Sequence, residues 1–453
     1  MRAGPEREDA SRRPSTEQLR ARLWFWPLVA SVGAFVLTLP LLTVRPRPDS
    51  ALAEWTFPGD ASTAASLLQT IATSVITAAS LTFSLTVVAL QLASQQFSPR
   101  LLRSFSRDAL VQVTIAVLVS TFTVSVLTLR SIDPERPLPV LAVLLATVLG
   151  LASAAALVVF VGHIVTRLRV DNMMANVHGD TRSSLEESYP LYDEGPPPPG
   201  ADLPGPDGGA LAPAWRSGFV RSVQPAPLTA AAERADVVVL LGVRPGDTVV
   251  EGTPIASVLT RDGRPGDVPA VEAGLRDAVA LGFERTEEQD AAFGLRQLVD
   301  MAVKAISPAV NDPTTAAEAL SYCGDLLVRL QARRLGPQAH ADSTGVVRLV
   351  TPDRDLRYYL DLVCAQVRRF GRGEPTVLTA VLRVLRDCAA CARDDEQRAE
   401  VRRQCALVLE DMSPDLLEDD ADAVRDMARR VELALAGDVG GAYGDRAGET
   451  RSI

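Results

Sequence analysis

A stripe of hydroxyl and carboxamide side chains runs through an apolar segment near the start of the chain. No charged residue occurs between Ala61 and Pro99. Polar residues recur there at alternating steps of three and four, which places them on one face of a helix. We assign to this polar stripe the residues Thr73, Thr77, Ser80, Ser84 and Gln91. Such oxygens can replace part of an ion's hydration shell and line a pore, but they also suit interhelical hydrogen bonding.

A second constellation of polar residues lies in the carboxyl-terminal half of the chain. Arg296, Asp300 and Lys304 are spaced at i, i+4 and i+8, and Asn311 and Asp312 follow shortly afterwards. This spacing puts the first three on one helix face, beside a turn that starts the next helix. The group predicts a site for an anionic effector or a partner. The alternative is a solvated ladder of charges with Asp312 as a helix cap.

The sequence gives no indication of enzymatic chemistry, a cofactor or a metal site. It contains none of the common nucleophile, nucleotide-binding or zinc-protease motifs, and it has three histidines. Cys388 and Cys391 form one C-x-x-C pair without a second pair to complete a zinc site, so we expect reduced packing cysteines. We therefore expect a protein that is not an enzyme.

Four hydrophobic segments must position the polar stripe. Apart from the striped segment, they cover 23–44, 109–129 and 138–165, and each is long enough to cross a bilayer. Asp108 is placed to cap the third segment. Away from their ends the segments contain no Asp, Glu, Lys or Arg, which disfavours proton relays and voltage sensors. His163 lies near the inner end of the fourth segment, where we expect an interfacial residue.

Two further patterns within these segments concern helix packing. The third segment carries hydroxyls on roughly one face, and the fourth repeats small residues that permit close approach of a neighbouring helix. The hydroxyls are Thr114, Thr121, Ser125 and Thr128, and the small residues are Ala142, Ala146, Gly150 and Ala154. We expect the fourth helix to continue past Thr166 without a break.

Arginines predict the orientation of the four segments. They are more frequent in the amino-terminal tail, at 100–107 and at 167–169 than in the loops at 45–64 and 130–137. Because cytoplasmic loops carry the excess of basic residues, both termini are expected in the cytoplasm. The net charge of −10 argues against general nucleic-acid binding.

The rest of the chain predicts a soluble α+β region after a Pro/Gly-rich linker. Short strands are expected at 218–223, 236–241, 248–250 and 254–259, and helices dominate after Pro269. Thr286 and Gln289 form a predicted capping box for the first of these helices. The expected organisation is a mobile tail at 1–22, four transmembrane helices within 23–170, a helical extension and linker at 171–213, a small β-rich domain at 214–268, a helical cytosolic domain at 269–436 and a disordered tail at 437–453.

Two phrases of the sequence resemble a known family. They are VVALQLASQQFSPRLLRSF and FERTEEQDAAFGLRQLVDMAVKAISPAVNDPTTAAEAL. Together with four spans before a soluble half, they resemble the bacterial membrane proteins grouped as domain of unknown function 2254. The resemblance covers roughly residues 23–436. It implies a multi-span membrane protein of bacteria with a cytosolic part, and it implies no established activity.

These observations lead to two functional hypotheses. The first is regulated permeation by a channel-like or transporter-like homo-oligomer in the lipid bilayer, with the cytosolic part acting as a gate or sensor. The second is a membrane-anchored sensor or scaffold without a permeation path. They differ in whether the polar stripe faces water or another helix.

Overall fold

A computed structural model describes residues 25–44, 60–96, 108–133, 136–167, 169–193 and 208–444. The chain divides into two compact units, Met1–Asn172 and Met173–Ile453. The expected tail at 1–22, the Arg100–Arg107 segment and the outer part of the linker lie outside the described residues.

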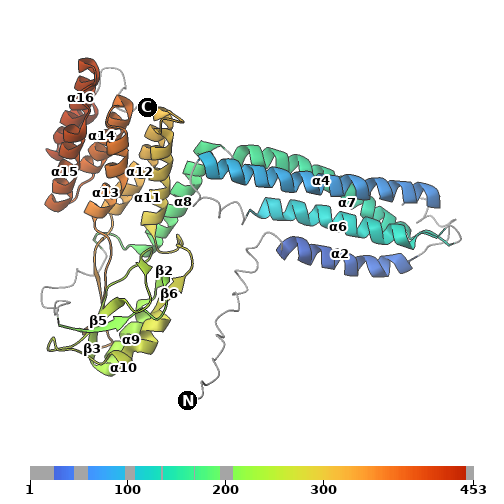
Figure 1. Cartoon of the computed structure of the whole chain (residues 1–453), viewed down its shortest axis with the longest axis horizontal. Helices are drawn as coiled ribbons and strands as arrows, with labels where there is room; N and C mark the ends of the chain where they lie inside the picture. The colour runs from blue at the N-terminus through green and yellow to red at the C-terminus, as the bar shows by residue number, and fades with distance from the viewer. Residues whose placement is uncertain are drawn as a thin grey trace, which may run out of the picture. The chain divides into compact units, whose positions relative to one another are not determined.

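The first unit is a bundle of four helices that run side by side (Figure 1). They are α2 (Phe25–Thr43), α4 (Ala61–Gln96), α6 (Ala109–Ser131) and α7 (Val140–Arg167). All four are long and apolar enough to cross a membrane. Helix α6 contacts each of the other three, so it forms the centre of the bundle.

Small side chains and caps explain how the bundle packs. Ala142 and Ala146 on α7 are fully buried, and a side chain at Gly150 would meet Ile71 of α4 at 3.4 Å. Ala154 is exposed, so the predicted small-residue contact ends one turn earlier than expected. Asp108 caps α6 as predicted, because its carboxylate accepts hydrogen bonds from the Leu110 and Val111 amides.

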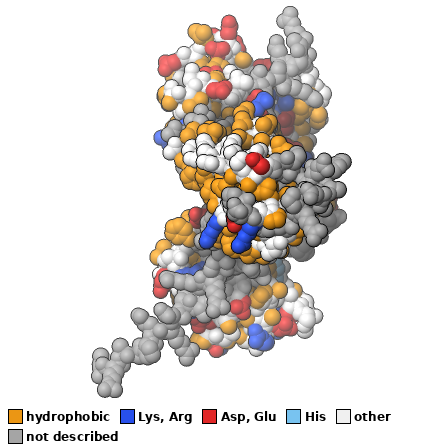
Figure 2. Space-filling view, turned by 90° about the vertical axis from the view of Figure 1, so that its right-hand side faces the viewer, with side chains coloured by type: hydrophobic (Ala, Val, Ile, Leu, Met, Phe, Trp, Pro, Cys, Tyr) orange, Lys and Arg blue, Asp and Glu red, His pale blue; other side chains and the backbone are white. Residues whose placement is uncertain are grey.

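The outer surface of the bundle is hydrophobic. Val36, Phe83, Leu151 and Val158 are each at least 60% exposed. In Figure 2, hydrophobic side chains gather near the middle of the face, next to polar and charged ones. Soluble proteins rarely expose such a large hydrophobic surface to water, so the composition of this surface is that of a lipid-facing one.

The fourth helix does not continue unbroken into the second unit, contrary to the expectation. Helix α7 ends at Arg167, and α8 (Val170–Ser188) begins three residues later. The Asn172 side chain donates a hydrogen bond of 2.7 Å to the Thr166 carbonyl. This bond satisfies one of the carbonyl groups that the end of a helix leaves without an intrahelical partner.

The second unit contains two small sheets. One has the strand order β1-β5-β3-β8-β7, in which the β3–β8 pair is parallel, and the other has the order β4-β2-β6. Their strands are β1 (Ala210–Pro213), β2 (Gly218–Val223), β3 (Val237–Leu241), β4 (Thr248–Val249), β5 (Pro254–Thr260), β6 (Val279–Gly282), β7 (Gln338–Ala341) and β8 (Val347–Thr351).

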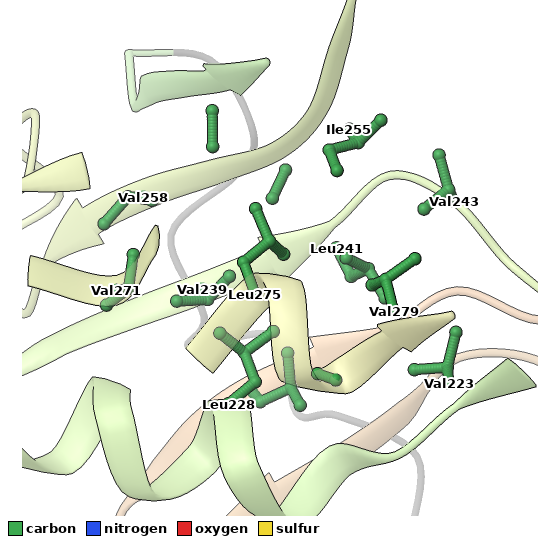
Figure 3. Close-up of a cluster of buried hydrophobic side chains, with 14 of the residues drawn as sticks. Val223, Leu228, Val239, Leu241, Val243, Ile255, Val258, Val271, Leu275 and Val279 are labelled. Carbon is green, nitrogen blue, oxygen red and sulfur yellow. The ribbon is translucent and has the colours of Figure 1, made fainter. Parts of the chain in front are cut away.

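Two short helices cover the sheets and complete a hydrophobic core. Leu228 of α9 (Pro225–Ala235) and Leu275 of α10 (Val268–Ala278) point into the same cluster as Val239 of β3 and Val279 of β6 (Figure 3). The core therefore joins elements of both sheets.

The strands β2 to β5 confirm the predicted strands, whereas four others were not expected. Strand β1 lies in the predicted linker, and β6, β7 and β8 lie in the stretch predicted to be helical. Each of these four strands has only four or five residues, so its local pattern carries little signal. They form because partners far along the chain bury them.

The remaining helices stack in two layers. Helices α11 (Ala291–Ala305), α12 (Pro313–Gln331), α14 (Pro375–Ala390) and α16 (Glu418–Leu435) contact one another in succession. Helices α13 (Leu356–Phe370) and α15 (Asp395–Asp411) pack against them. The carboxylates of Asp312, Asp355 and Asp394 cap α12, α13 and α15.

Two details of this helical region correct the sequence-based expectation. The predicted capping box does not form, because α11 begins after Asp290 and the Gln289 side chain accepts a hydrogen bond from the Val223 amide at 2.9 Å. The stretch predicted to be disordered from residue 437 contains a short helix, α17 (Val439–Tyr443). Tyr443 holds it in place by donating to Asp387 at 2.6 Å.

Candidate functional site

The polar stripe of α4 lies on the side of the helix that faces away from the bundle. Thr73, Thr77, Ser80, Ser84 and Gln91 are all exposed. The buried residues of α4 lie about 180° from them, given about 100° of rotation per residue. These are Ala64, Leu68, Ala72, Val75, Thr82, Thr86 and Ala89. The stripe therefore does not pack against α2, α6 or α7 of the same chain.

Two of the four hydroxyls of the stripe donate to the backbone of their own helix. Thr77 donates to the Thr73 carbonyl at 2.8 Å, and Ser84 donates to the Ser80 carbonyl at 3.0 Å. A hydroxyl that donates backwards in this way still presents oxygen lone pairs outward. The exposed face is consequently lined with acceptors, which is the chemistry that contacts water or a cation.

The buried face of α4 also carries hydroxyls, which the spacing of polar residues in the sequence did not indicate. Thr82 and Thr86 are buried and donate to the Ala78 and Thr82 carbonyls, both at 2.8 Å. Back-bonding of this kind lets Thr occupy an apolar interface. Its presence on both faces shows that a hydroxyl on α4 is not by itself a sign of contact with water.

The hydroxyls of α6 face the interior of the bundle. Thr121 is fully buried and lies 2.8 Å from the Ser153 hydroxyl of α7, so this pair joins two helices. Ser125 and Thr128 follow on the same face and are also fully buried, without a hydrogen-bond partner among the described residues. The stripes on α4 and α6 therefore differ: the first faces outward and the second connects helices.

His163 has a partner that the sequence did not indicate. Its Nε2 lies 2.7 Å from the carboxylate of Asp108, which also caps α6. The side chain of Asp108 is 6% exposed and that of His163 is 22% exposed. The pair fixes α7 to the first turn of α6, and the separation of 55 positions in the sequence explains why the contact was missed.

The residues predicted to bind an effector form an extended row along α11 and the turn that follows it. Arg296, Asp300 and Lys304 are half-buried on α11, while Asn311 and Asp312 lie in the turn before α12. Eight residues of helix separate Arg296 from Lys304, a distance of about 12 Å. The row is thus longer than a single small anion, so one such anion would not contact both ends of it.

Asp312 occupies the amino end of α12 with its own carboxylate. It accepts hydrogen bonds from the Thr315 amide at 3.1 Å and the Thr315 hydroxyl at 2.6 Å. These bonds hold the pKa of Asp312 below its ordinary value. Asn311 precedes it with a positive φ of 54°, a conformation that Asn tolerates better than most residues. The capping interpretation of Asp312 is confirmed, and an effector role for the row stays a prediction.

Four of the five cysteines are placed as packing residues, and the same expectation is wrong for Cys391, which is exposed. Cys323, Cys364, Cys388 and Cys405 are buried, whereas Cys391 is exposed. Burial raises the pKa of the Cys388 thiol well above its ordinary value, so this thiol is unreactive. Among the described residues there is no group of His, Cys, Asp and Glu that could hold a metal ion.

Comparison with known proteins places the chain in a family. The model of a family described as predicted membrane protein, domain of unknown function 2254, matches residues 20–387. The chain belongs to this family. Uncharacterised proteins of Mycobacterium bovis and Mycobacterium tuberculosis are each 33% identical to it over 413 residues, covering 88% of this chain and 77% of the relative. No solved structure matches the chain. The family description agrees with the four apolar helices of the first unit.

Proposed function

We propose that this protein provides a regulated permeation path across the bacterial inner membrane. The path would be lined by α4 from several copies of the chain, and the second unit would act in the cytoplasm as its gate or sensor. The proposed function is not enzymatic, and it needs neither a cofactor nor a metal ion. Arginine placement supports a cytoplasmic position for both termini.

The exposed polar stripe of α4 is the observation that carries this proposal. In a single copy the stripe faces away from the other three helices, so one chain cannot enclose a path with it. A closed symmetric ring of chains would bring several stripes to one axis. Helix α4 has 36 residues and is therefore about 54 Å long, so it exceeds the ~30 Å of hydrocarbon that it must cross.

The alternative is a membrane-anchored sensor or scaffold that conducts nothing. The hydrogen bonds within α4 favour it, because a hydroxyl that donates to its own helix can face lipid at little cost. Under this alternative, the stripe would contact lipid or the helix of another protein. The two functions make different predictions for a change that narrows a water-filled path.

The test compares two Ser→Leu substitutions on α4. Ser80→Leu lies in the stripe, while Ser74→Leu is also at an exposed position but lies about 90° away from the centre of the stripe. Purified protein is placed in liposomes, and ion flux and oligomer mass are measured for both variants and the wild type. We expect Ser80→Leu to abolish flux with the oligomer intact, because the larger apolar side chain narrows and dewets the path.

Three outcomes would contradict the permeation proposal. A monomeric wild type without flux would leave the anchored sensor as the better function. Equal effects of Ser74→Leu and Ser80→Leu on flux would show that the stripe does not line the path. Loss of the oligomer in Ser80→Leu alone would assign the stripe to packing between copies.

A further inference from the structure

A polar cavity of about 480 Å³ lies within the second unit, at the last turn of α8. Glu187 and Ser188 of α8 line it together with residues of β2, β7, β8 and the loop after β3. Its apolar wall includes Val223 and Val243, which belong to the core cluster in Figure 3. The α8 cavity is therefore built on a rigid core, which favours a pre-formed binding site.

One carboxylate at the α8 cavity is held in place by a buried network. Oδ1 of Asp353 accepts hydrogen bonds from the Arg354 amide at 2.6 Å and from the Tyr189 hydroxyl at 3.1 Å. Tyr189 in turn lies 2.9 Å from the Tyr359 hydroxyl. Oδ2 of Asp353 makes no hydrogen bond or ion pair with a described residue. The network thus orients a carboxylate and leaves one of its oxygens for the cavity.

Other polar side chains at the cavity are without a partner. Glu187, Gln224 and Gln338 line it, and their side chains make no hydrogen bond or ion pair with a described residue. Gln289 is fixed through its oxygen, which accepts from the Val223 amide, so that its NH₂ group is not used there. Polar groups that line a cavity and have no protein partner are available to a ligand.

The charges at the cavity favour a cationic ligand over an anionic one. The guanidinium group at the cavity belongs to Arg244. Its Nε lies 3.5 Å from Oδ1 of Asp247, and its Cζ lies 5.4 Å from the centroid of the Tyr358 ring. Burial lowers the pKa of His340, so its imidazole is neutral at pH 7. Glu187 and Asp353 have no such ion pair among the described residues. The lining carries three carboxylates, on Glu187, Glu288 and Asp353, against the guanidinium of Arg244, so the balance of charge favours a positively charged group, although Arg354 and Arg244 partly offset the charge of Asp353.

We propose that the α8 cavity binds a small organic amine, with its ammonium group between the carboxylates of Glu187 and Asp353. Primary amines fit this chemistry, because an ammonium group has three hydrogens to donate and the cavity offers acceptors on several sides. The amide side chains of Gln224 and Gln338 can accept hydrogen bonds from a second donor on the ligand. The apolar wall suits a short hydrocarbon chain between the two.

Because the cavity lies at the end of α8, a bound amine could regulate the permeation path, and this extension rests on the proposed function. Glu187 and Ser188 are the last two residues of α8. This helix begins three positions after the end of α7 in the chain. An amine that binds at one end of α8 would bias the conformation of the segment that leads into the last apolar helix. The binding itself does not depend on permeation.

The test measures binding to the full-length protein in detergent by titration calorimetry. The probes are cadaverine, a five-carbon diamine, and glutarate, a five-carbon dicarboxylate. We expect saturable binding of cadaverine and none of glutarate. Glu187→Gln keeps the size of the side chain and removes its charge, and it should weaken cadaverine binding by about 2–5-fold, as for a partly exposed ion pair.

A matched control separates the cavity from the overall charge of the protein. Glu410→Gln removes one carboxylate from an exposed position on α15, and it should leave the affinity for cadaverine unchanged. Equal weakening by Glu187→Gln and Glu410→Gln would overturn the proposal, since the net charge of −10 would then explain the binding. Absence of cadaverine binding to the wild type, or binding of glutarate instead, would overturn it as well. Flux measurements are independent of these results, so the two proposals fail separately.

Discussion

At the scale of single residues, several side chains have roles that their type alone does not reveal. Asp108 caps α6 and also lies 2.7 Å from His163, and Asp312 caps α12 with two hydrogen bonds. The sequence predicts both caps, because an Asp just before a helix is a local signal. It does not predict the His163 contact, because that contact depends on how α6 and α7 pack.

Replacement of Asp312 by Ala should destabilise the second unit by about 1 kcal/mol, the usual cost of a lost helix cap. Hydrogen bonds lower the pKa of this carboxylate in the folded state. Its contribution is therefore complete above the unfolded pKa of ~4 and is lost as the pH falls through the lower folded pKa. Urea unfolding of the purified protein at pH 7 and at acid pH measures both effects.

Asp415→Ala is the control for this cap, since Asp415 is exposed. It should change the unfolding free energy little at either pH. If Asp312→Ala left stability unchanged and abolished function, Asp312 would belong to an effector site and the capping role would be secondary.

At the scale of elements, the packing of α7 against α4 depends on small side chains. Ala146 is fully buried, so Ala146→Leu should force the two helices apart at a cost of about 1–3 kcal/mol. Val148→Leu, at a position that is 53% exposed on the same helix, is the matched control. Thermal unfolding in detergent should show a lower midpoint for the first variant alone. Equal midpoints would mean that α7 does not pack closely at Ala146.

The elements also show which parts of the fold and site the sequence can predict. The four apolar helices and strands β2 to β5 follow from composition and local pattern. Strands β6 and β8 do not, because their burial depends on partners remote in sequence, such as the pairing of Val239 with Leu349. The stripe of α4 was predictable, whereas its outward direction depends on which face α6 and α7 cover. The α8 cavity was not predictable, since six separate segments line it.

At the scale of the whole molecule, membrane topology can be read from two cysteine positions. Cys391 is the exposed cysteine of the described part of the chain. A membrane-impermeant maleimide should label Asp133→Cys in intact cells, because the loop at 130–137 is expected outside. It should label Cys391 only after the cells are opened. Burial and Asp387 raise the pKa of the Cys391 thiol, so labelling should be faster at pH 8 than at pH 7.

The wild type provides the control for this experiment, because it carries Cys391 and lacks the cysteine at position 133. Labelling of Cys391 in intact wild-type cells would reverse the predicted orientation. Such a result would also place the second unit and its α8 cavity outside the cytoplasm.

The parallel pairing of β3 with β8 has a consequence for how the chain is made. Strand β3 ends at Leu241 and its partner β8 begins at Val347, so α10, α11 and α12 are synthesised between them. While the ribosome completes this stretch, one edge of β3 has no neighbour, and exposed strand edges invite aggregation. By then the four apolar helices have already left the ribosome. A nascent chain arrested before Val347 should thus be held at the membrane with an unfinished sheet that chaperones can bind.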